Sequence, residues 1–435
     1  MQEKLINIIS LGCSKNLVDS ERLIKMMEDA GFSVKHNPKS IKRGTAVIIN
    51  TCGFIGDAKE ESVNVILDAL RMKKLNKVSS VYVMGCLSER YRKQLPELMP
   101  EVDGWFGKFD WQGIIKTLAR QAPGSTPYDR VITTGPYSAY LKIAEGCNRF
   151  CSFCAIPLIT GRFKSRPMDE ILAEVRSLVE RGVKEFNVIA QDLSSYGTDL
   201  ADGEMLLPQL IEAMAQIPGV EWIRLHYAYP AQFPFGILDV MNRYPNVCKY
   251  LDIALQHSSD KVLDNMRRHI TGAETEELIN AIREKVPGIH LRTTLMVGFP
   301  GEGDKEFEEL KDFVKRMKFE RMGAFAYCEE EDTYGAKHFK DDIPQEVKEK
   351  RLDELMTIQS EISYQLNQKK IGEIVRVLID GTENDYYVGR TEFDSPEVDP
   401  VVYIPKKDRM LRKGRFYNVR ITDATEYDLY GETVD

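Results

Sequence analysis

Long apolar runs and a surplus of positive charge are both missing from this 435-residue sequence. Crossing a bilayer takes about 20 consecutive apolar residues, so no membrane span is expected. The apolar run before Cys13 is also shorter than the roughly 7–15 apolar residues of a signal peptide, and Glu3 interrupts the leading charges. We therefore expect a first β-strand at the N-terminus and a cytoplasmic protein.

The sparse cysteines and the lack of excess positive charge each exclude some classes of protein. The net charge of −8 argues against general attraction to nucleic acid. Eight scattered cysteines in a chain of this size do not form the disulfide framework of a small secreted domain. These cysteines are expected to be free thiols or metal ligands.

The pattern of apolar runs predicts an α/β protein with three domains. In the first region, residues 1–122, strand-like runs alternate with amphipathic segments such as NLVDSERLIKMMEDAG, which predicts a parallel α/β domain. Residues 121–127, QAPGSTP, have the composition of a linker. A domain boundary is therefore expected there.

The remaining chain changes its periodicity once more. Between residues 134 and 366, strand candidates alternate with helical patterns and predict a parallel, partial (β/α)6 barrel, which ends in a long polar helix. Residues 368–435 contain short β-rich runs with no helical pattern between them, which predicts a small antiparallel β-barrel. Active sites of such parallel barrels lie at the carboxyl ends of the strands.

Three cysteines are crowded into the stretch EGCNRFCSFC, namely Cys147, Cys151 and Cys154. One interpretation is three small buried residues, and a second is structural zinc, which usually needs four ligands. No second cysteine pair is nearby, and all histidines are distant in sequence. Three thiolates suit a four-iron cluster better, since the fourth iron then stays open for a ligand.

This motif directly follows the first predicted barrel strand, AYLKIAE, and resembles the signature of the radical S-adenosylmethionine superfamily. The resemblance implies a [4Fe–4S] cluster on the three cysteines and S-adenosylmethionine bound at the open iron, with aromatic Phe153 near the cofactor. It also implies one-electron cleavage to a 5′-deoxyadenosyl radical, which requires a low-potential electron donor.

A second set of cysteines ends three strand candidates of the first region, at Cys13, Cys52 and Cys86. Neighbouring strands of a parallel sheet end at one edge, where ligand sites form. Each cysteine could instead be an ordinary buried residue, but three equivalent positions favour a second iron–sulfur cluster. Cys248 and Cys328 fit neither set and are expected to be packing residues.

The three predicted domains and two cysteine sets together resemble the radical methylthiotransferases, whose last domain is called TRAM. Matching segments include NTCGFIGDAKEES, IAQDLSSYG, LDIALQHSSDKVLDNMRR and LMVGFPGEG. The resemblance implies that the second cluster carries or donates sulfur. It also implies that one S-adenosylmethionine supplies the methyl group and another supplies the radical.

The family has two branches, which modify either adenosine in transfer RNA or the β-carbon of an aspartate in a small-subunit ribosomal protein. NTCGFIGDAKEES and IPLITGRFKSR resemble the ribosomal-protein branch. Residues 371–435 contain 9 Lys plus Arg and 14 Asp plus Glu, a net charge of 9 − 14 = −5. This barrel is expected to repel RNA and to attract a basic ribosomal protein, either free or within the ribosome.

Three alternatives to this assignment stay open. The acidic surface could serve solubility only, transfer RNA could be the substrate after all, or the chain could be a non-catalytic iron–sulfur redox protein. The acids thought to form the attracting surface lie in two stretches, EFDSPEVDP and TDATEYD. A nearby basic strip runs against that interpretation and contains Lys406, Lys407, Arg409, Arg412 and Lys413.

Polar residues at predicted strand ends are candidates for the cofactor pocket. Gln191 and Asp192 follow one strand and Gln256 ends another, although solvated loop positions would also explain them. Arg292 lies inside the apolar strand HLRTTLMV, where a charge needs a partner, and a carboxylate of the cofactor or substrate would serve. The segment GFPGEG, 298–303, is expected to be a strand-to-helix turn.

Overall fold

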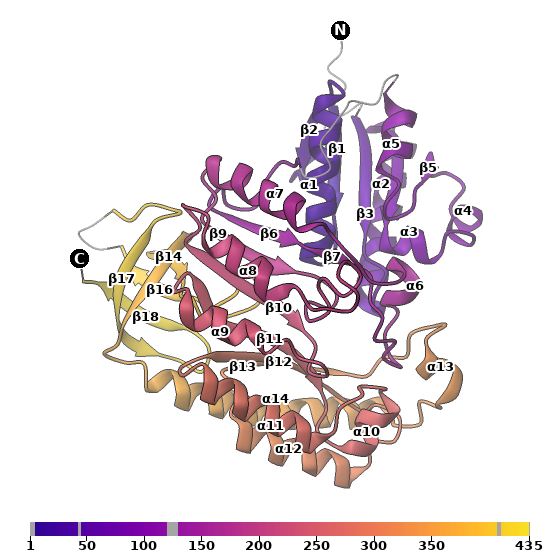
Figure 1. Cartoon of the computed structure of the whole chain (residues 1–435). Coiled ribbons are helices and arrows are strands. Elements are labelled where there is room, and N and C mark those ends of the chain that lie inside the picture. Colours follow the sequence, from indigo (N-terminus) through magenta and orange to yellow (C-terminus); the bar gives the residue numbers. More distant parts are fainter. Residues whose placement is uncertain (1–4, 42–44, 120–128, 407–409, 435) are drawn as a thin grey trace. The chain divides into compact units, whose positions relative to one another are not determined.

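The computed structural model describes residues 5–41, 45–119, 129–406 and 410–434 (Figure 1). This part of the chain divides into two compact units. The first contains the residues up to Thr134 together with 140–148 and 154–174, and the second contains 135–139, 149–153 and everything from Val175 onward. The linker predicted at 121–127 lies outside the described residues, so the boundary placed there remains a prediction.

The first unit has a parallel sheet with the strand order β2-β1-β3-β4-β5. The strands are β1 (Leu5–Ser10), β2 (Ser33–His36), β3 (Thr45–Thr51), β4 (Val78–Gly85) and β5 (Gly104–Trp105). The helices between them are α1 (Ser14–Asp29), α2 (Gly56–Lys74), α3 (Cys86–Arg90), α4 (Leu95–Leu98) and α5 (Trp111–Leu118). The predicted parallel domain is thus confirmed, while the short edge strands β2 and β5 were missed because each is too short to show a period.

Apolar residues bury both faces of this sheet. Val47 and Ile49 of β3 belong to one hydrophobic cluster, whereas Ile48 between them belongs to the other. Successive strand residues point to opposite faces, so a sheet covered on both sides needs a continuous apolar run such as AVII. That requirement explains why β3 shows no alternation of polar and apolar residues.

A second sheet has the strand order β13-β12-β11-β10-β9-β6 and is open at β13 and β6 in the described chain. Its strands are β6 (Ser138–Lys142), β9 (Glu185–Ile189), β10 (Trp222–Ala228), β11 (Val247–Gln256), β12 (His290–Val297) and β13 (Arg321–Ala326). Neighbouring strands from β9 to β13 all pair in parallel. Each coincides with a strand predicted from the sequence, and the open sheet confirms a partial barrel.

Helices connect these strands and cover the sheet (Figure 1). They are α7 (Met168–Glu180), α8 (Leu207–Ala215), α9 (Gly236–Arg243), α10 (Asp260–Asn265), α11 (Gly272–Lys285), α12 (Asp304–Met317), α13 (Tyr334–His338) and α14 (Gln345–Gln368). The predicted turn at 298–303 is confirmed, since it joins β12 to α12. The long polar helix is also confirmed, as α14.

The C-terminal strands close into a small barrel with the order β14-β15-β16-β18-β17. They are β14 (Ile374–Glu383), β15 (Tyr386–Arg390), β16 (Val402–Pro405), β17 (Phe416–Ala424) and β18 (Leu429–Thr433). The predicted antiparallel barrel is confirmed, with one exception in detail: β16 and β18 pair in parallel while the other pairs are antiparallel. A ring with an odd number of strands cannot alternate direction throughout, so one pair must be parallel.

Candidate active site

The three cysteines of the first unit lie at the carboxyl ends of adjacent strands. Cys13 caps α1 shortly after β1, Cys52 directly follows β3, and Cys86 begins α3 directly after β4. Because β1, β3 and β4 are neighbours in the sheet, the chain returns to one edge three times. The topology thus places these cysteines where the sequence predicted a ligand site.

Two glycines let these cysteine loops approach closely. If Gly12, whose φ is +81°, were replaced by a residue with a side chain, the new Cβ would lie 2.7 Å from Cys52 Cβ. A side-chain carbon on Gly53 would lie 2.6 Å from the backbone nitrogen of Leu87 and 2.8 Å from the carbonyl carbon of Cys86. Any other residue at these positions would push the loops apart.

The thiols of this set lie within electrostatic range of one another. Burial raises the pKa of Cys86 to about 12, Lys108 opposes that shift, and the other two thiols add to it. Burial also raises the pKa of Cys52, with a further contribution from Cys13. Thiolates that crowd together in this way are stabilised by a bound cation, so this donor set fits a metal cluster.

A buried network of charges lies beside these thiols. Lys108 Nζ is 3.2 Å from Glu145 Oε2 and 3.9 Å from Asp19 Oδ2, and Lys142 forms ion pairs with both carboxylates. Asp19 and both lysines are nearly inaccessible to solvent. Burial by itself lowers the pKa of Lys108, but Asp19 and Glu145 outweigh burial and raise this pKa, with smaller contributions from Cys86 and Cys13.

The cysteine motif that follows β6 is divided between the two units. Cys147 and Cys154 belong to the first unit, where the Cys147 backbone N–H donates to the Gly161 carbonyl at 3.3 Å. A side-chain carbon on Gly146 would lie 2.2 Å from the carbonyl oxygen of Arg162. The short ladder of β7 (Ala144–Glu145) and β8 (Lys164–Ser165) holds the two ends of this loop together.

Cys151 belongs to the second unit, where it is buried beside a cation. Arg268 Nη1 donates to Cys151 Sγ at 3.2 Å, and the hydroxyl of Tyr229 lies 3.8 Å from the same sulfur. The Tyr229 hydroxyl donates to the Arg268 carbonyl at 2.8 Å. Burial, reinforced by Cys151, raises the pKa of Tyr229 in spite of Arg268, so this phenol stays a hydrogen-bond donor.

Arg149, the arginine within the cysteine motif, is held by polar groups from two other loops. Arg149 donates to Asp192 Oδ2 at 2.6 Å, to Gln232 at 3.0 Å and to Ser195 at 3.1 Å. Its guanidinium also lies 4.2 Å from the centre of the Tyr229 ring. The other carboxylate oxygen of Asp192 is buried and has no hydrogen-bond partner among the described residues. It is therefore available to accept a hydrogen bond from a ligand.

The remaining residues predicted to line the cofactor pocket lie at strand ends. Gln191 is half-buried in the loop after β9, and Gln256 is the last residue of β11, with φ at +74°. Such a backbone conformation is rare for a residue with a side chain and is found most often at functional sites. Their contact with a cofactor remains a prediction.

Phe153 has a hydrophobic environment in the second unit. It is half-buried, and its ring meets that of Phe299 edge to face at a centroid distance of 6.3 Å. The same hydrophobic cluster contains Val262, Met266 and Tyr327. Phe153 therefore packs against the core, and a role beside the cofactor remains a prediction.

The structure does not support the cofactor role suggested for Arg292. Its guanidinium lies 3.4 Å from Asp252 and 3.3 Å from Asp399, so carboxylates of the chain itself balance the charge. Arg292 is also the third residue of β12, at the end of the strand remote from the cysteine loops. The sequence correctly indicated a carboxylate partner but could not reveal that Asp399 supplies it from the C-terminal barrel.

The acidic surface predicted for that barrel also needs correction. The side chains of Asp394 and Asp399 are buried. Asp394 pairs with Arg321 at 2.7 Å, and Asp399 accepts a hydrogen bond from Tyr250 at 2.8 Å. They therefore join the barrel to the sheet of the second unit and cannot attract a partner. Glu397, Asp423 and Glu426 are exposed. Lys407 and Arg409 of the basic strip lie outside the described residues.

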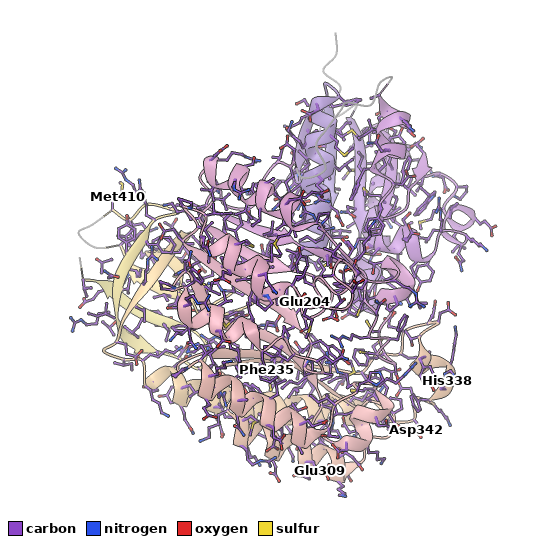
Figure 2. The ribbon with its side chains drawn as sticks, in the orientation of Figure 1. Glu204, Phe235, Glu309, His338, Asp342 and Met410 are labelled. Atoms are coloured by element: carbon purple, nitrogen blue, oxygen red, sulfur yellow. The ribbon has the colours of Figure 1, made fainter. Side chains whose placement is uncertain are left out.

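A groove of about 510 Å³ opens beside the Arg149 contacts. It is lined by residues of the loop after β10, including Gln232, and by residues at the start of α11, including Glu274. Phe235, labelled in Figure 2, also lines this groove and exposes 46% of its surface. The polar groups around Arg149 are thus close to a surface with both apolar and acidic side chains.

No group of three Cys, His, Asp or Glu side chains within residues 5–41, 45–119, 129–406 and 410–434 forms a preassembled site for a metal ion. All eight cysteines are free of disulfides. In an iron–sulfur cluster each thiolate binds its own iron, so the sulfur atoms need not converge on one point. The crowded thiols of Cys13, Cys52 and Cys86, and the thiol of Cys151 beside Arg268, fit such a cluster.

Three segments of the chain match known protein families. Residues 141–314 match the radical SAM superfamily, residues 371–434 match the TRAM domain, and residues 5–107 match Uncharacterized protein family UPF0004. One match falls within each of the three predicted regions. With the open parallel sheet and the cysteine loop after its first strand, they define a radical S-adenosylmethionine protein.

Full-length relatives then give the family. The chain is 56% identical over 434 residues to the ribosomal protein uS12 methylthiotransferase RimO of Bacteroides fragilis, with 100% of both chains covered. It is 48% identical over 432 residues to the protein of that name from Flavobacterium johnsoniae, covering 99% of this chain and 98% of the relative. The chain belongs to the RimO family of methylthiotransferases.

Solved structures with the same fold are much more distant in sequence. The radical S-adenosylmethionine methyltransferase TsrM from Kitasatospora setae is 14% identical, covers 75% of each chain and has a TM-score of 0.54. The cobalamin-dependent radical enzyme OxsB is 12% identical, covers 82% of this chain and 56% of its own, and has a TM-score of 0.52. These similarities show the fold alone.

Three residues near Cys151 were not identified from the sequence as parts of a site. Arg149 lies inside the cysteine motif, where a cation beside metal ligands is a usable signal. Tyr229 and Arg268 are 78 and 117 positions from Cys151. Nothing local to either residue indicates that contact, although Arg268 lies in the segment LDNMRR that resembles the family.

Proposed function

We infer that this protein is a radical S-adenosylmethionine methylthiotransferase that modifies ribosomal protein uS12. The observation that carries this inference is identity of 48–56% over essentially the whole chain to proteins of that name. Identity on this scale covers the first unit, the radical domain and the TRAM barrel together. Modification of transfer RNA by the same chemistry is not favoured.

The residues present fit two iron–sulfur clusters, which we propose are both [4Fe–4S]. Cys147, Cys151 and Cys154 would hold one, and the set at the ends of β1, β3 and β4 would hold the other. When bound, the first cluster supplies the electron for reductive cleavage of S-adenosylmethionine. A low-potential electron donor must provide that electron.

In this proposal, side chains of the protein bind the cofactor and provide charge beside the second cysteine set. Asp192 holds Arg149 with one carboxylate oxygen and presents the other, unpartnered and buried, to the cofactor. Lys108, paired with Asp19 and Glu145, places a buried cation beside the second cysteine set. Positive charge there would favour anionic sulfur, which the transfer requires.

The last element of the proposal is the atom of the substrate that is modified. We propose that the methylthio group is added to the β-carbon of an aspartate in uS12, free or within the ribosome. A radical is suited to this carbon, because no side-chain base could deprotonate it. The substrate places the enzyme in the cytoplasm. No helix in the described part of the chain is long and apolar enough to span a membrane.

A competition assay tests the substrate. Anaerobically reconstituted enzyme would receive S-adenosylmethionine, a reductant, purified uS12 and bulk transfer RNA in one mixture. Mass spectrometry would then measure methylthiolated peptides and nucleosides. The triple variant Cys147→Ala, Cys151→Ala and Cys154→Ala serves as the control for cofactor cleavage.

We expect a methylthiolated aspartate in uS12 and unmodified adenosine, with neither product from the control variant. Methylthio groups on adenosine together with unmodified uS12 would overturn the substrate but leave the radical chemistry in place. Iron binding without any S-adenosylmethionine cleavage would overturn the enzymatic function and favour a redox protein.

A further inference from the structure

Cys151 differs from an ordinary buried thiol because a guanidinium group is aimed at its sulfur. Arg268 Nη1 donates to Cys151 Sγ at 3.2 Å, and only 3% of the Arg268 surface is exposed. The same arginine donates through Nη2 to the backbone carbonyl of Ala254 in β11. The guanidinium is therefore fixed to the sheet and cannot turn away from the sulfur.

An aromatic ring connects this arginine with the arginine of the cysteine motif. The centre of the Tyr229 ring lies 4.1 Å from the guanidinium carbon of Arg268 and 4.2 Å from that of Arg149. Cation–aromatic contacts at these distances stabilise both groups. Ser194 holds the backbone of Tyr229 by accepting from its N–H at 2.8 Å. The ring is thus a rigid support for two cations.

We propose that Arg268, supported by Tyr229, is a positioning residue that raises the reduction potential of the cluster held by Cys151. The proposal rests on the proposed function only in assuming that an iron–sulfur cluster binds at this cysteine. It concerns the ease with which that cluster accepts an electron, and it holds whatever the methylthiolated substrate is.

The direction of the effect follows from electrostatics. Reduction adds one negative charge to the cluster and its thiolates, and a buried cation stabilises that charge more than it would in water. Hydrogen bonds to the sulfur atoms act in the same direction and are known to tune cluster potentials. Removing Arg268 should therefore make the cluster harder to reduce.

The neighbouring residue supplies a matched control. Arg267 carries the same charge, but its guanidinium lies 4.6 Å from the ring centre of Tyr334, in the same unit. Arg267 is half-buried, and among the described residues it is Arg268, not Arg267, that donates a hydrogen bond to Cys151. Arg267→Gln thus removes one positive charge from the same loop without removing the donor to the sulfur.

The test is a redox titration followed by electron paramagnetic resonance. It would use a background in which Cys13, Cys52 and Cys86 are alanine, so that a single cluster gives the signal. Arg268→Gln, Arg268→Lys and Arg267→Gln would be compared for midpoint potential, iron per protein and circular dichroism. Cleavage of S-adenosylmethionine would be recorded separately.

We expect Arg268→Gln to weaken one-electron reduction at least tenfold, which corresponds to about 59 mV toward more negative potential. Arg268→Lys should shift the potential less because it keeps the charge, and Arg267→Gln should stay near the parent value. Equal potentials in all variants that retain their iron would overturn the proposal. Loss of the cluster in both Arg268 variants, with circular dichroism unchanged, would also overturn it and assign Arg268 to cluster assembly.

An iron-free parent protein would instead contradict the proposed function, since no cluster would then occupy the Cys151 site. A parent that binds iron and cleaves S-adenosylmethionine, but modifies neither uS12 nor transfer RNA, would leave the potential measurement fully interpretable. The two proposals therefore fail in different ways.

Discussion

Arg390 of the C-terminal barrel forms a bidentate ion pair with Glu185 of β9, although the two residues are 205 positions apart in the sequence. Arg390 Nη1 and Nη2 donate to the two carboxylate oxygens of Glu185, each at 2.8 Å. Both side chains are buried, and Arg224 also pairs with Glu185. Burial opposes ionisation of Glu185, but Arg390 and Arg224 outweigh it and hold its pKa well below the usual value.

Arg390→Gln should therefore destabilise the protein strongly. The substitution leaves the buried carboxylate of Glu185 and the partly exposed carboxylate of Asp380 with one fewer partner, and breaking a buried pair such as Arg390–Glu185 costs roughly 3–5 kcal/mol. Arg376→Gln is the control, since its ion pair with Glu221 is partly exposed and should contribute less than about 1 kcal/mol. Urea unfolding would measure both, and equal effects would contradict the importance of the buried pair.

Asp394 should make stability depend on acid pH. Burial opposes its ionisation, but Arg321 and Lys370 outweigh burial and lower its pKa from 3.8 to about 2. A lowered pKa contributes stability that is complete above about pH 4 and is lost as pH falls toward 2, about 2 kcal/mol in all. Asp394→Asn should flatten the unfolding free energy across that window. An unchanged slope would show that Asp394 is not responsible.

Replacing each cysteine set should separate the two parts of the reaction. The reconstituted enzyme should hold about eight irons if both clusters are cubanes. Alanine at Cys147, Cys151 and Cys154 should halve the iron and abolish 5′-deoxyadenosine formation. Alanine at the other three cysteines should halve the iron and stop sulfur transfer but spare cofactor cleavage. Zinc in both sites after anaerobic preparation would contradict the mechanism.

Gly53→Ala should disrupt the second cluster selectively. The new methyl group would lie within 3 Å of the backbone of Leu87 and Cys86, which cannot move aside as a flexible side chain could. The loops that carry Cys52 and Cys86 would have to separate, so iron per protein should fall toward half. Gly381→Ala is the control, because a side-chain carbon there meets nothing within 4 Å. Full iron content in Gly53→Ala would show that the loops tolerate separation.

Phe153→Ala tests whether this aromatic residue serves the cofactor or the core. Losing its edge-to-face contact with Phe299 should lower the free energy of unfolding by about 2 kcal/mol, less than for a fully buried ring. We also expect weaker S-adenosylmethionine binding, measured anaerobically by calorimetry, with little change in iron. Phe153→Leu restores most of the packed volume. Normal cofactor affinity in both variants would assign Phe153 to the core alone.

Much of the fold was predictable because strands and helices differ in the local pattern of apolar and polar residues. The run TAVIINT is short and almost continuously apolar, whereas the segment after it shows the period of an amphipathic helix, and this contrast in length and pattern distinguishes strand from helix. The position of Cys13, Cys52 and Cys86 after such runs was enough to predict that they meet at one sheet edge. The strands β2 and β5 were missed because a few residues at a sheet edge carry no period.

The candidate site was less predictable, because charge and burial depend on distant neighbours. Asp394 and Asp399 resemble surface acids in sequence, yet each is buried against an arginine of the sheet. Arg292 seemed to need an external carboxylate until the barrel supplied one. A net charge summed along a segment counts these internal pairs as though they faced solvent.

The sequence by itself determined the order of strands and helices, the two cysteine sets and the family, since spacing and identity are properties of the chain. Only the tertiary structure decided which side chains act on those cysteines. Arg268 reaches Cys151 across 117 positions, and Tyr229 reaches it across 78. Such contacts arise because parallel strands bring their following loops to one edge, while the side chain that finally touches the sulfur is selected by packing.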